Sequence, residues 1–260
     1  MNDNKKNSKD AGRFSLEFAF FCVVLAVIAA VLIYLSVYAY KIIETYEKSE
    51  EGAVDADISN AMPTVIIDAG HGGEDGGTEG KNGVKEKDLN LDIAFKLRDI
   101  LKAYGMNVIL TRSEDILLYD RNVDYKGHKK SLDLKARLDI AKSVPDSIFV
   151  SIHMNAYPSD KYSGLQVWYS KNDTGSKLLA DTVQSLIRER LQNENNRKIK
   201  AADSSIYLLD RAVSPSVLVE CGFLSNPAEC EKLSDENYRR SVAFVISMAI
   251  MSYSANNGCK

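Results

Sequence analysis

The sequence predicts an α/β fold: a single three-layer domain with a mostly parallel central sheet flanked by helices, preceded by one transmembrane helix. Two observations predict the domain. Short apolar runs of strand length alternate with longer segments of helical periodicity, and a strand follows the first of these helices directly, as in a βαβ unit. A third observation, a long uncharged stretch near the N-terminus, predicts the membrane helix.

The membrane segment is predicted over residues 18–40, which contain no charged side chain. At about 1.5 Å per residue, a helix of this length exceeds a hydrocarbon core of roughly 30 Å. It is also longer than the apolar part of a cleaved signal peptide, usually about 7 to 15 residues, so we expect a transmembrane helix or uncleaved signal anchor. Cleavage near Ala39, followed by secretion, remains an alternative.

Basic residues before this stretch predict its orientation. They are Lys5, Lys6, Lys9 and Arg13. The positive-inside rule therefore predicts a cytoplasmic arm over residues 1–17 and places the rest of the chain outside the cytoplasm. Residues 41–62 are polar and acidic and read as a stalk, and residues 63–260 as one catalytic domain. The charge balance, with a net charge of −3, does not suggest nucleic acid as a partner.

The first half of the domain reads as strand, helix, strand. A strand is expected at 64–68, and a helix is expected to begin with Asp88 as its cap and to stop at Gly105. A strand at 106–111 follows, and then a long loop at 113–131, of a length that is usually functional or mobile.

The second half continues the alternation and shows no internal repeat. The expected helices are 132–143, 176–193 and a final one around 238–249, and the expected strands are 147–152, 164–169 and 217–221.

Four polar residues stand where these apolar runs end or a helix begins. His71, His153 and Glu220 each close such a run, and Glu86 stands at a helix start. The carboxyl ends of parallel strands meet at one edge of the sheet, where ligands bind. Two imidazoles and a carboxylate are the ligand set of a catalytic zinc, and a further carboxylate can take a proton from water. From spacing alone the acidic ligand stays open, because the competing acids are Glu74, Asp75 and Glu79.

The loop Asp68-Ala-Gly-His-Gly-Gly-Glu-Asp-Gly-Gly is not a dinucleotide loop. The fingerprint G-x-G-x-x-G, starting at Gly70, requires glycine where Asp75 stands, and the acids would repel phosphate. Its glycines instead let the backbone pass close to an ion and present His71 on a tight turn. The remaining histidine, His128, lies among lysines in the long loop and is expected at the surface.

Five blocks of sequence resemble one known family. They are Asp68-Ala-Gly-His-Gly-Gly, Glu86-Lys-Asp-Leu-Asn-Leu, Thr111-Arg112, Ser151-Ile-His-Met-Asn-Ala and Val219-Glu-Cys-Gly-Phe-Leu-Ser-Asn-Pro. In this order they are similar to the zinc-dependent N-acetylmuramoyl-L-alanine amidases of type 3. The resemblance implies one Zn²⁺ per chain, bound by His71, Glu86 and His153, and it implies that Glu220 is the catalytic acid/base.

The resemblance also implies a substrate and a setting. The substrate is peptidoglycan, cut at the amide between N-acetylmuramic acid and L-alanine. An anchor with a single catalytic domain is most similar to the sporulation branch, which acts in spore cortex maturation toward muramic-δ-lactam, needed for germination. The catalytic domain would then lie in the cell envelope or the spore intermembrane space. Two alternatives are another zinc peptidase on the same fold and a non-enzymatic, anchored wall-binding protein.

Further residues near the motifs are candidates for supporting roles. Asn155 is expected to orient the substrate carbonyl or support His153, and Asp68 to fix the tautomer of a ligand histidine. Arg112 and Arg137 either meet substrate carboxylates or, as we favour, pair within the fold. An apolar run at 116–119 in the long loop is a candidate site for an extracytoplasmic regulatory protein, with packing onto its own domain as the alternative.

Overall fold

A computed structural model describes residues 28–38, 40–41, 62–120, 122 and 124–257. The chain divides into two units, 1–59 and 60–260. In the first unit the described residues are helical and expose their apolar side chains. Among the described residues, no helix has the length and apolarity that crossing a membrane requires. Much of the span expected at 18–40, and most of the expected stalk, lies outside the described residues.

The second unit is built on a six-stranded sheet with the order β2-β1-β3-β6-β4-β5. The strands are β1 (Val65–Ala69), β2 (Val108–Leu110), β3 (Ile148–Asn155), β4 (Gln166–Tyr169), β5 (Lys200–Ala201) and β6 (Ser216–Phe223). Strands β2, β1, β3 and β6 are parallel, whereas β4 runs antiparallel to β6 and parallel to β5. The expected mostly parallel sheet is confirmed, with β4 making it a mixed sheet.

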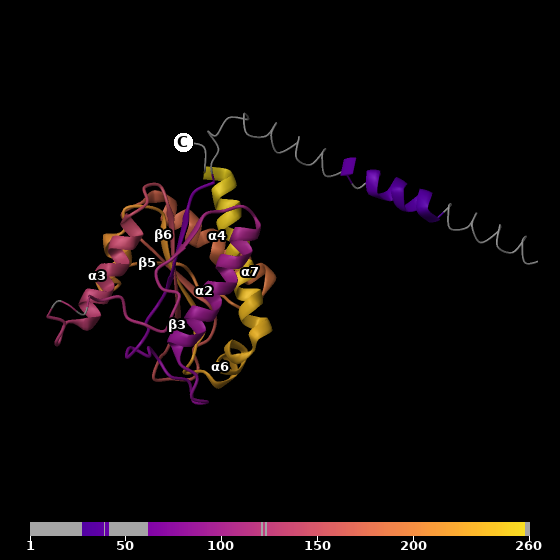
Figure 1. Ribbon diagram of the computed structural model, residues 1–260. Helices are drawn as coiled ribbons and strands as arrows, with labels where there is room; N and C mark the ends of the chain where they lie inside the picture. The colour runs from indigo at the N-terminus through magenta and orange to yellow at the C-terminus, as the bar shows by residue number, and fades with distance from the viewer. Residues whose placement is uncertain (1–27, 39, 42–61, 121, 123, 258–260) are drawn as a thin grey trace, which may run out of the picture. The chain divides into compact units, whose positions relative to one another are not determined.

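Helices cover both faces of this sheet (Figure 1). They are α2 (Glu86–Ala103), α3 (Lys129–Lys142), α4 (Thr174–Arg190), α5 (Tyr207–Arg211), α6 (Pro227–Ser234) and α7 (Glu236–Asn257). Helices α2, α4 and α7 pack a large apolar core on one face, and α3 and α5 pack a smaller one on the other. The smaller core contains Ile66, Phe149 and Leu218 from three neighbouring strands. Because side chains alternate along a strand, Asp68, His153 and Glu220 belong to this same face.

The helix ends differ in detail from the expected ones. Helix α2 begins at Glu86, so Asp88 lies in its first turn and is not its cap, and the predicted cap is wrong. The stop at Gly105 is confirmed, and its φ of 80° is the left-handed conformation that glycine tolerates. Helix α4 begins two residues before its expected start, because the Asp173 carboxylate accepts hydrogen bonds from the backbone N–H groups of Gly175 and Ser176.

Two strands continue beyond their expected ends. Strand β3 runs to Asn155 and β6 to Phe223, so His153 and Glu220 lie inside strands and not at their ends. The two residues are register partners on neighbouring parallel strands, and the register shifts between His153 and Asn155. This pairing places the two side chains next to each other. The sequence prediction did not include β5, α5 or α6.

Candidate metal centre and active site

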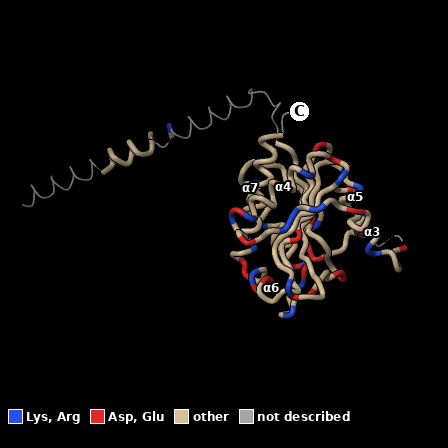
Figure 2. Tube along the Cα trace, turned by 180° about the vertical axis from the view of Figure 1, so that it is seen from behind, with Lys and Arg blue, Asp and Glu red and all other residues tan. Residues whose placement is uncertain are grey.

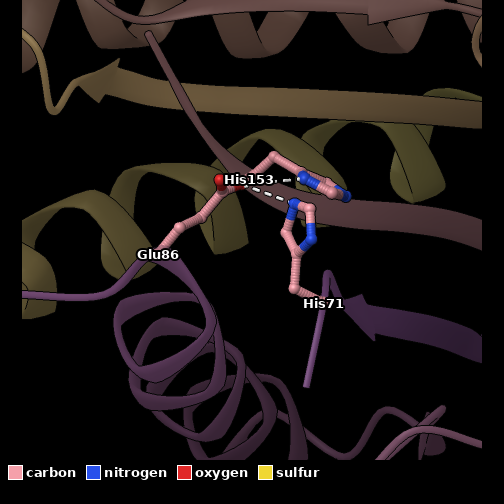
Figure 3. A group of neighbouring side chains, drawn as sticks. All are labelled: His71, Glu86 and His153. Carbon is pink, nitrogen blue, oxygen red and sulfur yellow. Dashed lines mark hydrogen bonds and ion pairs between the residues drawn. The ribbon is translucent and has the colours of Figure 1, made fainter. Parts of the chain in front are cut away.

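Three side chains from separate elements converge near the carboxyl edge of the sheet. His71 follows β1 by two residues, Glu86 is the first residue of α2, and His153 lies in β3. One ligand atom from each lies within 4.8 Å of the other two. Figure 3 shows both imidazoles turned toward the Glu86 carboxylate, whose Oε1 lies 3.2 Å from His71 Nε2 and 3.0 Å from His153 Nδ1.

Two glycines make room for this convergence. A Cβ atom at Gly70 would lie 2.3 Å from the His153 ring, and one at Gly77 would lie 2.6 Å from Glu86 Oε2. Real Cβ atoms essentially never come so close to other heavy atoms. The glycine-rich loop between β1 and α2 therefore allows the backbone to touch two of the three converging side chains. The close approach was expected from the sequence, although toward an ion and not toward these side chains.

Glu86 is buried and held as a carboxylate. Its Oε1 accepts a hydrogen bond from the Met154 backbone N–H at 3.0 Å, and its Oε2 accepts one from the Thr78 backbone N–H at 2.9 Å. Burial alone would raise the pKa of Glu86, but contacts with His153 and His71 lower it well below its usual range. A carboxylate that stays charged while buried is suited to bind a cation.

His71 stands in an unusual backbone conformation, with a φ of 62°. Its carbonyl oxygen accepts a hydrogen bond from Arg137 Nη2 at 2.6 Å, which supports this conformation. On the ring, Nδ1 lies 2.9 Å from Asp75 Oδ2, within ion-pair distance but without hydrogen-bond geometry. Burial lowers the pKa of His71, but Glu86 and Asp75 outweigh it and the net shift is upward.

Glu220 lines a cavity of about 270 Å³ together with His71 and His153. Its Oε2 is buried and has no hydrogen-bond partner among the residues that the structure describes. Burial, followed by the neighbouring Glu86 charge, raises the pKa of Glu220 to about 7 despite opposing effects of the histidines. A carboxyl group with a pKa near neutrality is suited both to accept and to donate a proton.

Behind the site, Asp68 and Arg137 form a buried ion pair. Arg137 Nη1 lies 2.7 Å from Asp68 Oδ1, and Arg137 Nε lies 2.8 Å from Asp133 Oδ2. Asp68 also accepts hydrogen bonds from Ser151 and Thr111. The hydrogen bonds of Asp68 thus go to these residues, and the structure does not support the expected contact with a ligand histidine; Asp75 is the acid placed beside His71.

The guanidinium group of Arg112 contacts the protein backbone. It is buried and donates hydrogen bonds to four carbonyl oxygens. These acceptors are Ala69, Gly70, Lys87 and Glu114. Arg112 and Arg137 thus pair within the fold, as favoured from the sequence, and brace the loop that carries His71.

The other predicted residues occupy more peripheral places. Asn155 ends β3, and its backbone oxygen accepts the Leu224 N–H at 2.9 Å, while its side chain makes no hydrogen bond with the described residues. His128 is exposed, as expected. Asn90 was not predicted from the sequence; its Nδ2 lies 3.1 Å from the Gly70 oxygen and 3.5 Å from Glu86 Oε1. Its position one helical turn after Glu86 was the available clue.

The clustered atoms fit a bound metal ion. Two imidazole nitrogens and one carboxylate oxygen, with space left for water or substrate, are the donor set of a catalytic zinc. Both imidazole rings approach one oxygen of the Glu86 carboxylate, and a cation between the three groups would fit this arrangement. Glu220, in the same cavity, supplies a carboxyl group that is not part of this cluster.

Comparison with known proteins identifies the family. Residues 65–252 match the model of the type 3 N-acetylmuramoyl-L-alanine amidases. The chain belongs to this family. The match covers the sheet, the converging ligands and Glu220, so the peptidoglycan amidase activity expected from the five sequence blocks is supported by the family as a whole.

Individual relatives agree with this assignment. The germination-specific N-acetylmuramoyl-L-alanine amidase of Bacillus subtilis is 36% identical over 194 residues, which cover 75% of this chain and 81% of the relative. The CwlD amidase of Clostridioides difficile, solved in complex with the GerS lipoprotein, is 41% identical with a TM-score of 0.71, covering 75% of this chain and 100% of that one. The catalytic domain of CwlV from Bacillus (Paenibacillus) polymyxa is 31% identical with a TM-score of 0.62, covering 74% and 98%.

Proposed function

We propose that this amidase is zinc-dependent and cleaves the bond between N-acetylmuramic acid and L-alanine. The observation that carries the proposal is the cluster of His71, Glu86 and His153 beside the buried carboxyl group of Glu220. When bound there, zinc polarises the substrate carbonyl and lowers the pKa of water at the site.

The residues of the chain divide the remaining work. Glu220 accepts a proton from the attacking water and delivers it to the L-alanine nitrogen as the C–N bond breaks, which releases the peptide as a neutral amine. Glu86 stays charged because the His153 and His71 imidazoles favour its ionised form, and Asp75 lies beside the His71 ring within ion-pair distance. Arg137 and Arg112 hold the loop that carries His71.

The three histidines of the chain provide a matched test of the ligand assignment. We expect the zinc-loaded wild type to contain one zinc per chain, and we expect His71→Ala and His153→Ala to lose the metal and the cleavage of purified peptidoglycan. His128→Ala, an exposed histidine outside the site, should retain both. Full zinc occupancy in His71→Ala and His153→Ala would refute the assignment. Cleavage of peptides that lack a muramoyl group would favour the alternative of a general peptidase.

We further propose that the substrate is spore cortex and that cleavage prepares muramic-δ-lactam for germination. The support comes from the relatives, since one is described as germination-specific and covers most of this chain. Mass analysis of digested cortex and vegetative peptidoglycan tests this setting. Equal release of peptides from both materials would leave the cortex role without support.

A protein partner near the loop 113–131 is also proposed. The CwlD amidase, to which this chain is 41% identical, was solved with a lipoprotein, and this supports the proposal. In the loop, Ile116 remains 39% exposed, whereas Leu118 is half-buried and its backbone N–H donates to Asp133. Part of the run therefore packs on its own domain, and Ile116 is the residue left for a partner.

This partner proposal is tested by Ile116→Ser, with Leu178→Ser on α4 as a control of similar exposure. We expect spore or envelope extract to stimulate the wild type and Leu178→Ser, and to stimulate Ile116→Ser less. If extract does not stimulate the wild type, or if it stimulates Ile116→Ser and Leu178→Ser equally, the loop is not a partner site.

A further inference from the structure

A second, cationic pocket lies beside the active site. It has a volume of about 520 Å³ and is shallow and polar. Four of its eight lining residues are basic: Lys161, Arg197, Lys198 and Lys200. None of the lining residues is acidic, and within the described chain none of these four side chains forms an ion pair.

The pocket is one strand away from Glu220. Its residue Gln166, in β4, is the register partner of Glu220 in β6. Side chains of register partners lie on the same face of a sheet, about 5 Å apart. The next pair on this face is Trp168 with Leu218, and Trp168 packs against the smaller core on the active-site face. The cationic pocket is therefore a lateral continuation of the active-site face across β4 to β5.

Hydrogen bonds from Gln166 fix the basic segment in place. Its Nε2 donates to the Lys198 backbone oxygen at 2.8 Å, and its Oε1 accepts from Arg197 Nη1 at 3.0 Å. Arg197 Nε also donates to the Ser163 oxygen at 2.6 Å. On β5, Lys200 Nζ lies 5.0 Å from the centre of the Trp168 ring. These contacts hold the backbone of the basic segment and the Arg197 side chain in place.

No acidic residue among those that line this pocket offsets its four positive charges. The carboxylate that acts on Arg197 is that of Glu229, which is buried and accepts hydrogen bonds from the backbone N–H groups of Gly164 and Phe223. Along much of the rest of the domain's trace, basic and acidic residues are interspersed (Figure 2). Four like charges around one hollow repel one another and create a positive potential that favours an anionic ligand.

We propose that this pocket binds the carboxylates of the peptide half of the substrate; the proposal rests on the amidase function proposed above. Adjacent strands are about 4.8 Å apart, so the two steps from β6 to β5 cover roughly 10 Å. An extended peptide spans this distance with about three residues. A peptide whose first nitrogen lies at Glu220 therefore brings any carboxylates on its second and third residues within reach of the lysines.

The test uses the full-length, zinc-loaded chain in two variants with the same change in charge. One replaces Lys161, Lys198 and Lys200 by Gln; Arg197 is retained because it also holds Ser163 and Gln166. The control replaces three exposed lysines at the ends of helices by Gln: Lys102, Lys142 and Lys177. The substrates are soluble muramyl peptides with free carboxylates and the same peptides with those carboxylates amidated.

We expect the wild type and the control to have a lower KM for the acidic substrate than for the amidated one. In the pocket variant, KM for the acidic substrate should rise on the order of tenfold, because three exposed positive charges are lost, and the preference should disappear. The wild-type preference should also weaken as salt is added. A defect of the fold alone would raise KM for both substrates equally. That outcome, or an unchanged preference in the pocket variant, overturns the proposal.

A binding measurement separates this proposal from the amidase function. The acidic peptide without a muramoyl group is titrated into Glu220→Gln, with and without the three pocket substitutions. Weaker binding after the pocket substitutions supports the pocket even if no muramyl peptide is cleaved, in which case the amidase proposal alone fails. The proposal is overturned if the acidic peptide binds equally well to Glu220→Gln with and without the pocket substitutions. It is also overturned if Glu220→Gln binds the amidated peptide as well as the acidic one.

Discussion

Glu86 and Glu220 lie in one site, and their different surroundings shift the pKa values of the two carboxyl groups in opposite directions. The His153 and His71 imidazoles lower the pKa of Glu86 despite its burial, and its two oxygens also accept hydrogen bonds from two backbone N–H groups. Glu220 is desolvated, its Oε2 makes no hydrogen bond with any described residue, and its pKa rises to about 7. A pair of carboxyl groups with pKa values held apart in this way indicates distinct roles, here charge for a metal and proton transfer for catalysis.

The proton-transfer role predicts the behaviour of Glu220→Gln. The variant keeps a side chain of the same shape, so fold and zinc content should match the wild type, while amidase activity falls by at least about a hundredfold. Zinc analysis and peptide release from purified peptidoglycan measure the two properties. A variant that is nearly as active as the wild type would place the acid/base elsewhere.

The buried pair of Asp68 and Arg137 predicts a pH dependence of stability. Burial alone would raise the pKa of Asp68, but Arg137, Ser151 and Thr111 lower it from 3.8 to about 2. A carboxyl group whose pKa is lower in the folded chain stabilises the fold above its unfolded pKa. The contribution, about 2 kcal/mol, is thus present above roughly pH 4 and is lost as the pH falls through about 2.

Asp68→Asn tests this linkage by urea unfolding at several pH values. We expect a loss of about 3 kcal/mol at pH 7, because the substitution removes a buried partner of Arg137, and a flatter pH dependence between pH 4 and 2. Asp139→Asn, an exposed residue of α3, is the control and should change little. Equal stability of the two variants would contradict the importance of the buried pair.

At the scale of elements, the loop between β1 and α2 determines the site. It carries His71, touches His153 through Gly70 and touches Glu86 through Gly77. The loop is held from behind, since Arg112 and Arg137 donate to its backbone oxygens. The strands and α2 bring the three residues near each other, and this loop sets how closely they meet.

Two glycines in this loop provide a matched prediction. Gly70→Ala places a methyl group 2.3 Å from the His153 ring, whereas the nearest atom to a methyl group at Gly76 is 3.9 Å away. Neither glycine has a positive φ that would itself penalise alanine. We therefore expect Gly70→Ala to bind zinc at least about tenfold more weakly, since the ring must move, and Gly76→Ala to bind it normally. Zinc titration checks both, and equal affinities would show that Gly70 does not limit the position of His153.

Those parts of the fold and the site that strong local sequence patterns specify were predicted from the sequence. The apolar runs of β1, β3 and β6 fixed the strands that carry the site, and the family motifs selected Glu86 among several nearby acids. Local patterns did not reveal β5, which has two exposed residues and depends on pairing with β4. The partners of Asp68 were also out of reach, because Arg137 is 69 residues away and the contact exists only after folding.

At the scale of the whole molecule, the chain combines a catalytic unit with an N-terminal segment of different character. The described helical residues of that segment expose apolar side chains such as Ile28 and Leu32. Basic residues precede the uncharged stretch at 18–40, and an acidic stretch follows it. We propose that this stretch anchors the enzyme in the membrane with its catalytic unit outside the cytoplasm, close to its insoluble substrate.

The anchor is tested by the membrane association of the full-length chain. We expect the wild type to sediment with membranes, to resist extraction at alkaline pH and to dissolve in detergent, with an intact N-terminus by mass. Ile28→Asp combined with Leu32→Asp should release it, because each acidic residue near the centre of a span costs about 3 kcal/mol. The control, Ile42→Asp with Ile43→Asp, places the same charges just beyond the expected span and should remain bound. Release of the wild type by alkaline treatment would refute the anchor, and an N-terminus beginning after Ala39 would instead identify a cleaved signal peptide and a secreted enzyme.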